Sequence, residues 1–291
     1  MRYRSTHVTT YDYEAPVSQC LSEAHLTPRV LSGQRVFASE IKVEPAAASA
    51  EHRIDYFGNH VSLYSILERH EQLIVTATSL VEVLPPNMSS LPVITWEETR
   101  AHLSDYPDEA ALAAYEFVFD SPFVAISPQL EAYGAPSFQP DMPLAEVAID
   151  LSRRIHIDFK YAPKATSIDM PLADVLKIRQ GVCQDFAHVM IGVLRSYGLA
   201  ARYVSGYLRS GTKYQGAEAS HAWVSVFLPG HGWLDLDPTN DVIPTDGHIT
   251  VAWGRDYGDV TPVKGVSLGG GGQTVEVAVR VDPDDSTTLD E

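Results

Sequence analysis

The stretch GVCQDFAHVMIGVLRSYG, residues 181–198, decides how the rest of the chain is interpreted. Its apolar residues recur at helical spacing after Cys183, and Gly198 follows the last of them, which predicts a buried helix between these two residues. The unpaired amide groups of a helix N-terminus stabilise negative charge, so this position favours the thiolate form of a cysteine. A cysteine at the start of a helix is still more often a packed side chain than a nucleophile. A catalytic role for Cys183 therefore requires suitable partner residues.

Two predicted strands supply candidate partners. In SHAWVSVFL, residues 220–228, alternate residues are apolar, and His221 lies on the opposite, more polar face. In GWLDLD, residues 232–237, Asp235 and Asp237 likewise lie opposite the apolar face. A three-residue turn at 229–231 that keeps both apolar faces together sets Asp235 beside Ser225. Asp237 then lies one diagonal step from His221, within side-chain reach.

A thiol, an imidazole and a carboxylate in this arrangement have a defined chemistry. The imidazole of His221 can accept the thiol proton of Cys183 and later deliver it to a leaving amine. A carboxylate on the far side of the imidazole, Asp237, fixes the tautomer and orientation of the ring. Backbone amides at the start of the helix can stabilise the oxyanion of a tetrahedral intermediate. The sequence therefore predicts a Cys183, His221, Asp237 triad.

The surrounding chain shows one change of pattern. Alternating β-branched and aromatic residues predict four strands in the first third, at 3–13, 34–43, 60–66 and 72–83. Helical patterns follow at 109–117, 143–157 and 171–178, and Thr95 with Glu98 has the spacing of a capping box. Further strands are predicted at 200–208, 249–253 and 274–281, and proline-bearing loops at 121–142. The glycine run 269–272 has no phosphate-loop lysine after it, so we expect a flexible hairpin loop there.

Composition narrows the class of protein. The chain has 291 residues, a hydrophobic fraction of 45% and a charged fraction of 20%, which are typical of a globular protein with a sizeable core. Its formal net charge of -17 argues against nucleic acid as a partner. The chain has only two cysteines, a polar start without a secretory pattern, and no long apolar run. We therefore expect free thiols, no membrane association and a cytoplasmic location.

The quoted stretches together resemble the core of the bacterial transglutaminase-like superfamily. The resemblance rests on GVCQDFAH at 181–188, SHAWV at 220–224 and GWLDLDPTN at 232–240, in this order. The first part of the chain, to about residue 83, resembles the β-rich N-terminal domain that accompanies this core in bacteria, and GRDY at 254–257 resembles the family's C-terminal end. By similarity, Cys183, His221 and Asp237 are the triad.

The resemblance implies an α+β fold with a papain-like, transglutaminase-like core and an N-terminal all-β, sandwich-like domain. We expect residues 1–86 to form the β-rich domain and 87–142 a helical and loop connection. Residues 143–282 are expected to form the catalytic core with the C-terminal strands, and 283–291 an acidic tail. Family members cut or exchange amide bonds through a thioester. Tyr161 lies where relatives carry an aromatic residue of the active site, so it is a candidate for the oxyanion site, and Trp223 is a candidate for a wall of the cleft.

Three functions remain open at this stage. The first is cysteine-dependent hydrolysis of a peptide or isopeptide amide in a protein or peptide substrate. The second is protein-glutamine amine acyltransfer, and the third is a non-catalytic binding or assembly module with the same fold. We expect no cofactor. A zinc site made of Cys183, His188 and His221 lacks a fourth ligand in the sequence, so His188 is expected to be a core histidine.

Overall fold

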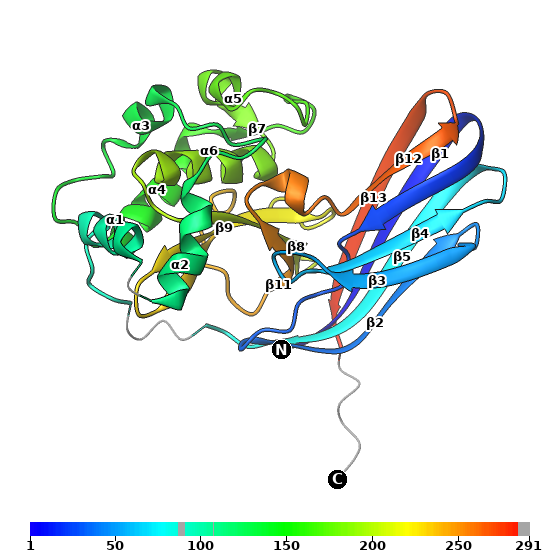
Figure 1. Cartoon of the computed structure of the whole chain (residues 1–291), viewed down its shortest axis with the longest axis horizontal. Helices are drawn as coiled ribbons and strands as arrows, with labels where there is room; N and C mark the ends of the chain where they lie inside the picture. The colour runs from blue at the N-terminus through cyan, green and yellow to red at the C-terminus, as the bar shows by residue number, and fades with distance from the viewer. Residues whose placement is uncertain (87–90, 107, 285–291) are drawn as a thin grey trace, which may run out of the picture.

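The computed structural model describes residues 1–86, 91–106 and 108–284, and it has two parts that lie side by side (Figure 1). One part is a large β-sheet, and the other packs helices against a smaller sheet. Val81 and Val281 of the large sheet share one continuous core with Leu194 and Val224 of the helical part. The fold is α+β, as predicted, with a β-rich N-terminal region.

The large sheet is organised by its longest strand, β1 (Arg2–Ala24). The first half of β1 lies between β5 and β13, and the second half lies between β4 and β12. Side chains of β4 and β5, such as Tyr64 and Leu73, meet in one buried cluster, so the two halves form a sandwich-like arrangement. The other strands are β2 (Gln34–Glu44), β3 (Ser49–Ile54), β4 (His60–Ile66), β5 (His70–Val83), β12 (Val263–Gly269) and β13 (Gln273–Pro283).

The two C-terminal strands differ from their expected place. The sequence grouped them with the core of residues 143–282, whereas both pair with β1 in the large sheet. Both run antiparallel to β1, one after the other along it, so the glycine run 269–272 continues the course of the chain and does not form a hairpin. The reason is the length of β1, which offers β12 and β13 separate stretches of one strand. The remaining domain limits stay predictions, and residues 285–291 of the expected acidic tail lie outside the described residues.

The helical part is built around α6 (Cys183–Ser196), which packs against β8 and β9. The predicted capping box of Thr95 and Glu98 is confirmed at the start of α1. In the described part of the chain, no helix is long and apolar enough to cross a bilayer. The helices are α1 (Trp96–Asp105), α2 (Glu109–Tyr115), η1 (Glu116–Val118), α3 (Pro128–Gly134), α4 (Leu144–Asp158), α5 (Leu172–Ile178), α6 and η2 (Tyr257–Asp259). The smaller sheet has the order β10-β9-β8-β11, with β8 (Ala201–Leu208), β9 (His221–Leu228), β10 (Gly232–Leu236) and β11 (His248–Gly254), and β6 (Lys160–Tyr161) pairs separately with β7 (Gln180–Gly181).

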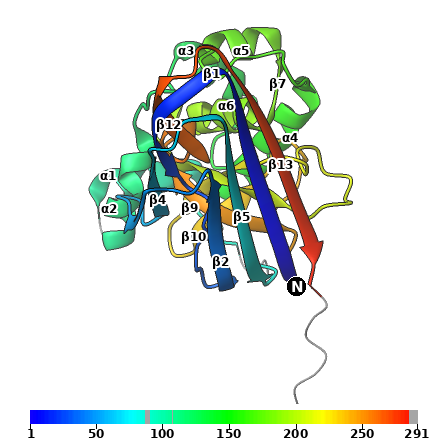
Figure 2. The ribbon, with the colours of Figure 1, turned by 90° about the vertical axis from the view of Figure 1, so that its right-hand side faces the viewer.

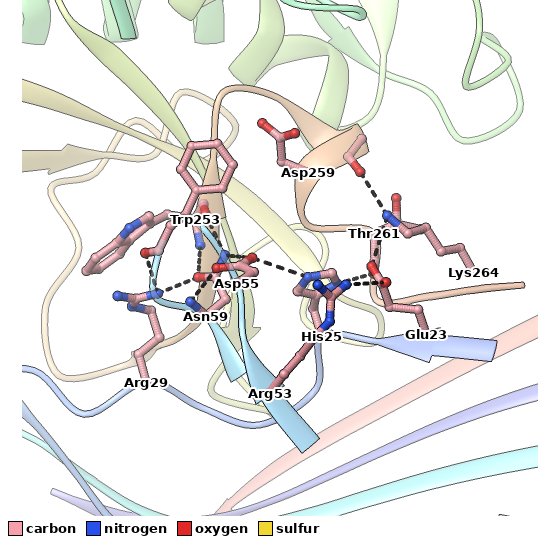
Figure 3. A network of polar contacts seen from close by, with 12 residues as sticks. Glu23, His25, Arg29, Arg53, Asp55, Asn59, Trp253, Asp259, Thr261 and Lys264 are labelled. Carbon is pink, nitrogen blue, oxygen red and sulfur yellow. Dashed lines mark hydrogen bonds and ion pairs between the residues drawn. The ribbon is translucent and has the colours of Figure 1, made fainter. Parts of the chain in front are cut away.

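A polar network joins the two parts where the turn after β3 meets β11 (Figure 3). The buried side-chain amide of Asn59 accepts a hydrogen bond from the backbone N–H of Trp253 at 3.0 Å and donates one to its carbonyl oxygen at 2.8 Å. Asp55 accepts from the same amide at 2.8 Å and lies 3.5 Å from His25. The guanidinium of Arg29 stacks on the Trp253 ring at 3.5 Å. These contacts hold β11, and with it the small sheet, against the large sheet.

Candidate active site

Cys183 is placed by the junction of β7 and α6. The carboxylate of Asp185 accepts hydrogen bonds from the backbone N–H of Val182 at 2.8 Å and from the hydroxyl of Thr166 at 2.7 Å, which caps the helix. Gly181 makes room for that carboxylate, because a Cβ there would lie 2.3 Å from its Oδ2 atom. The thiol therefore stands at the first position of α6, where the backbone N–H groups have no helical acceptor.

His221 and Asp237 meet as the register argument predicts. Strands β9 and β10 pair with Asp235 opposite Ser225, which is the predicted register. The Nε2 atom of His221 lies 2.8 Å from Oδ2 of Asp237, and both side chains are fully buried. An ionised carboxylate can only accept, so Nε2–H is the donor and the other ring nitrogen is free of this bond.

The free nitrogen of His221 has no fixed partner other than the nearby thiol. Nδ1 is buried without a partner of normal hydrogen-bond geometry in the described residues. Burial lowers the pKa of His221, but the nearby charges of Asp237 and Cys183 and the hydrogen bond to Asp237 outweigh burial and raise it to about 10. Burial likewise opposes ionisation of Asp237, yet His221 and His248 hold its pKa well below the usual range. The buried pair therefore favours an imidazolium at His221 beside an ionised carboxylate at Asp237.

Asp237 has hydrogen-bond partners in addition to His221. Its Oδ1 atom accepts from the backbone N–H of Thr239 at 3.0 Å, and its Oδ2 atom accepts from the side-chain amide of Asn240 at 2.8 Å. The Nε2 atom of His248 lies 3.3 Å from Oδ2. Asn240 also accepts from the backbone N–H of Gln215 at 2.8 Å. The carboxylate is thus fixed in direction and linked to the loop that precedes His221.

Cys183 opens onto a cavity of about 1030 Å³. The cavity is lined by Tyr161, Tyr203 and Tyr257 from the helical part, by the loop between Ser210 and Ser220, and by Arg280 of β13. Only 8% of Cys183 is exposed, so a reacting group has to enter this cavity to reach the sulfur. The site therefore combines a buried ion pair with a thiol that lines an accessible space.

Comparison with known proteins identifies the family. Residues 3–82 match the profile of the bacterial transglutaminase-like N-terminal region, and residues 134–238 match that of the transglutaminase-like superfamily. A protein of Mycobacterium tuberculosis is 39% identical over 302 residues, which cover 99% of this chain and 95% of that protein. The chain belongs to the transglutaminase-like superfamily.

Two further comparisons concern a solved structure and a second relative. A crystal structure of a cysteine protease candidate from Cytophaga hutchinsonii is similar with a TM-score of 0.75 and 19% identity, covering 100% of this chain and 94% of that one. At this identity the likeness concerns the fold. A protein-glutamine gamma-glutamyltransferase of Pseudomonas aeruginosa is 37% identical over 117 residues, which cover 35% of this chain and 16% of that protein.

The two aromatic residues predicted near the site, Tyr161 and Trp223, differ in their position relative to the cavity of Cys183. Tyr161 lines the cavity of Cys183, and burial together with the charge of Cys183 raises its pKa to about 12. Trp223 does not line that cavity. Its ring is fully buried, stacks on His221, and donates from Nε1 to Asp235 at 3.2 Å. The expectation that Trp223 walls the substrate cleft therefore differs from the structure, because Trp223 instead lines a separate cavity of about 370 Å³ with residues of β11 and the large sheet.

Sequence reasoning missed His248 and Asn240. Asn240 ends the quoted stretch 232–240, so its place beside Asp237 had a signal; His248 had none, because the pairing of β11 with β8 brings it in from outside the motifs. His188 was one of the three residues of the zinc site considered from the sequence. It accepts a hydrogen bond from the backbone N–H of Tyr257 at 3.2 Å. Burial lowers the pKa of His188 to about 4. Among the described residues, no three His, Cys, Asp or Glu side chains gather as a metal site.

Proposed function

We propose that this protein is a cysteine-dependent hydrolase that cleaves a peptide or isopeptide amide through a thioester at Cys183. The observation that carries the proposal is the 2.8 Å contact between His221 and Asp237, with the remaining nitrogen of His221 beside the thiol. That arrangement supplies a nucleophile, a proton carrier and a group that orients the carrier. The cavity at Cys183 gives a protein or peptide substrate access to the sulfur.

The proposed reaction has two halves. In the first, His221 Nδ1 holds the proton of Cys183 while the sulfur attacks the amide carbonyl carbon, and the imidazolium then protonates the leaving amine as the C–N bond breaks. In the second, His221 removes a proton from water, which attacks the thioester, releases the acid and returns the sulfur as thiolate. The N–H of Cys183, in the first turn of α6, and the hydroxyl of Tyr161 are candidates to stabilise the oxyanion.

A peptide library tests this proposal. The wild-type protein is incubated with the library, and mass spectrometry follows new carboxyl and amino ends. Cleavage that disappears in Cys183→Ala and persists in Cys20→Ala supports a thioester mechanism at Cys183. If Cys183→Ala cleaves as well as the wild type, the proposed nucleophile is wrong.

Amine transfer is the second candidate, supported by the likeness of 35% of this chain to part of the Pseudomonas glutamyltransferase. In transfer, a primary amine replaces water as the group that attacks the thioester. Adding a dansyl-labelled primary amine at millimolar concentration to the same library separates the two reactions. Label incorporation faster than acid release would replace hydrolysis by acyltransfer as the main activity.

A further inference from the structure

Strand β13 is the outer strand of the large sheet on the side of the active site. β13 pairs with β1 on one side only, and Figure 2 shows it at the edge of the sheet. At the C-terminal end of β13, its other side contacts the loop between Ser210 and Ser220, which lines the cavity of Cys183 and is called the active-site loop here. The backbone N–H of Val279 donates to the carbonyl oxygen of Glu218 at 2.8 Å, and the N–H of Ser210 donates to that of Val281 at 3.0 Å.

The edge of β13 is open in its preceding residues. In an antiparallel pair, alternate residues direct both backbone groups away from the partner strand. Val279 and Val281 bond outward, and the pairing with β1 continues without a register shift to Gln273. The backbone groups of Val275 and Val277 therefore point outward as well, and none of the described residues bonds to them. The side chains of Val275 and Val277 are 48% and 42% exposed.

A second cavity connects this open edge with the active site. It measures about 660 Å³ and is lined by Val275 and Val277, with Tyr11 and Tyr13 of β1 beside them. Ser220 and Tyr257 line both this cavity and that of Cys183, so the two spaces adjoin. Among the described residues, no acidic side chain lines the second cavity, although the chain carries a net charge of -17. Most of its walls are apolar, aromatic and hydroxyl groups, and Lys264, His7 and Gln273 also line it.

We propose that an extended segment of a polypeptide substrate binds as an added strand on the open edge of β13, at Val275 and Val277. Backbone groups of the segment pair with those of β13, and alternate side chains enter the second cavity beside Tyr11 and Tyr13. The segment continues past Ser220 toward Cys183. This inference rests on the proposed function and adds its substrate class. The substrate is an unfolded or loop segment with apolar or aromatic residues at alternate positions, and not a single side chain presented by a compact protein.

A proline substitution tests the backbone contact. Val277→Pro removes only an outward-facing N–H, which edge strands tolerate, and Val277→Thr keeps that N–H with a similar shape. Both are made in the Cys183→Ala background, and binding of fluorescein-labelled casein, an unfolded polypeptide, is measured by anisotropy. Losing one such hydrogen bond should weaken casein binding roughly fivefold in Val277→Pro and less than twofold in Val277→Thr. Val275→Pro serves the same purpose if Val277→Pro does not fold.

The outcomes separate this inference from the proposed function. Val277→Pro is also made in the protein that keeps Cys183, and iodoacetamide labelling of Cys183 in that variant at the wild-type rate shows that the active site is intact. If both folded proline variants bind casein as tightly as their parent, the edge is not the binding site, even when the wild type cleaves peptides. If the proline variants instead dissociate a dimer and leave casein binding unchanged, the edge serves a second copy of the chain and the proposal fails. Edge-dependent casein binding without any cleavage leaves the binding site standing and overturns the proposed function.

Discussion

Two polar clusters lie next to each other on strands β9 and β10, and they differ in the partners of their carboxylates. In the first, Asp237 is paired with His221, whose charge interacts with Cys183, and Cys183 lines a cavity. In the second, Asp235 accepts hydrogen bonds from the hydroxyl of Ser225 and the indole of Trp223. Its neighbour Arg202 stacks between Trp233 and Trp253, at 4.1 Å and 3.7 Å. We call these the triad cluster and the tryptophan cluster.

The comparison shows that a carboxylate with hydrogen-bond donors does not by itself indicate chemistry. Both aspartates follow the same alternation and lie on the same face of the sheet. Asp235 is half-buried, and its donors, the hydroxyl of Ser225 and the indole of Trp223, do not transfer protons at neutral pH. Asp237 holds a histidine that can carry a proton to and from an accessible sulfur. The partner beyond the carboxylate therefore distinguishes the two clusters, and the following experiments test that distinction.

The largest difference is expected between Asp237→Asn and Asp235→Asn. Asn at 237 keeps the shape but removes the acceptor that fixes the tautomer of His221, which costs on the order of 10⁴ in turnover in serine triads. Asp235→Asn should reduce turnover less than tenfold, since the tryptophan cluster does not touch the reacting atoms. Turnover of one peptide substrate by both variants gives the ranking. A larger loss in Asp235→Asn would mean that the roles of the clusters are reversed.

The two thiols extend the comparison to reactivity. Cys183 stands at a helix N-terminus beside His221, whereas Cys20 is buried in the large sheet and lies 3.2 Å from the hydroxyl of Ser22. We expect iodoacetamide near neutral pH to label Cys183 at least roughly 30-fold faster than Cys20, because the thiolate is the reacting form. Mass spectrometry of a partly alkylated sample measures both rates. Equal rates would remove the distinction between the triad cluster and an ordinary packed thiol.

Asn240 tests whether Asp237 needs its additional donors. Asn240→Ala removes the 2.8 Å bond to Asp237 and the link to the backbone of Gln215. Loss of one charge-assisted hydrogen bond should lower kcat/KM roughly tenfold. Gln215→Ala is the matched control, because the contacts of Gln215 to Asn240 use its backbone only. An equal loss in both variants would indicate a general effect of the loop.

The smallest expected difference between the two clusters is in how the stability change caused by a substitution depends on pH. The pKa of His221 is raised to about 10 in the folded protein, against about 6.5 in an unfolded chain. Its stabilising charge is then fully present below about pH 6.5 and is lost as pH rises toward 10. The Tm difference between wild type and His221→Gln should therefore shrink by a few degrees across this window. Trp223→Phe should show a difference that stays constant with pH, and a constant difference for His221→Gln would contradict the raised pKa.

The triad cluster was largely predictable because a local pattern determines it. The alternation of residues 220–228 and 232–237 fixes the register that brings Asp237 to His221, and the helical spacing after Cys183 places the thiol at the start of α6. Contacts between distant segments had no such signal. His248 reaches Asp237 only through the pairing of β11 with β8. No motif or periodicity announces that pairing.

Local pattern also failed for elements that are fully exposed, short or interrupted by proline. Every residue of β3 (Ser49–Ile54) is exposed, so the segment shows no alternation and was not predicted. The helix α3 (Pro128–Gly134) is only seven residues long and lies in a region that prolines suggested to be a loop. The continuation of β1 beyond Tyr13 is interrupted by Pro16 and a register shift. β12 and β13 pair with β1 from the other end of the chain, so no local pattern predicts this pairing.

The pairing of β1 with β13 also sets an order of events during synthesis. Tyr3 pairs with Pro283, so the first strand waits for a partner that leaves the ribosome after every residue of the triad cluster. The active-site loop depends on the same late segment, since Glu218 and Ser210 bond to Val279 and Val281. A nascent chain that already holds Cys183, His221 and Asp237 thus lacks the strand that fastens this loop. The active-site loop is therefore fastened only after β13 has been synthesised, later than every residue of the triad cluster.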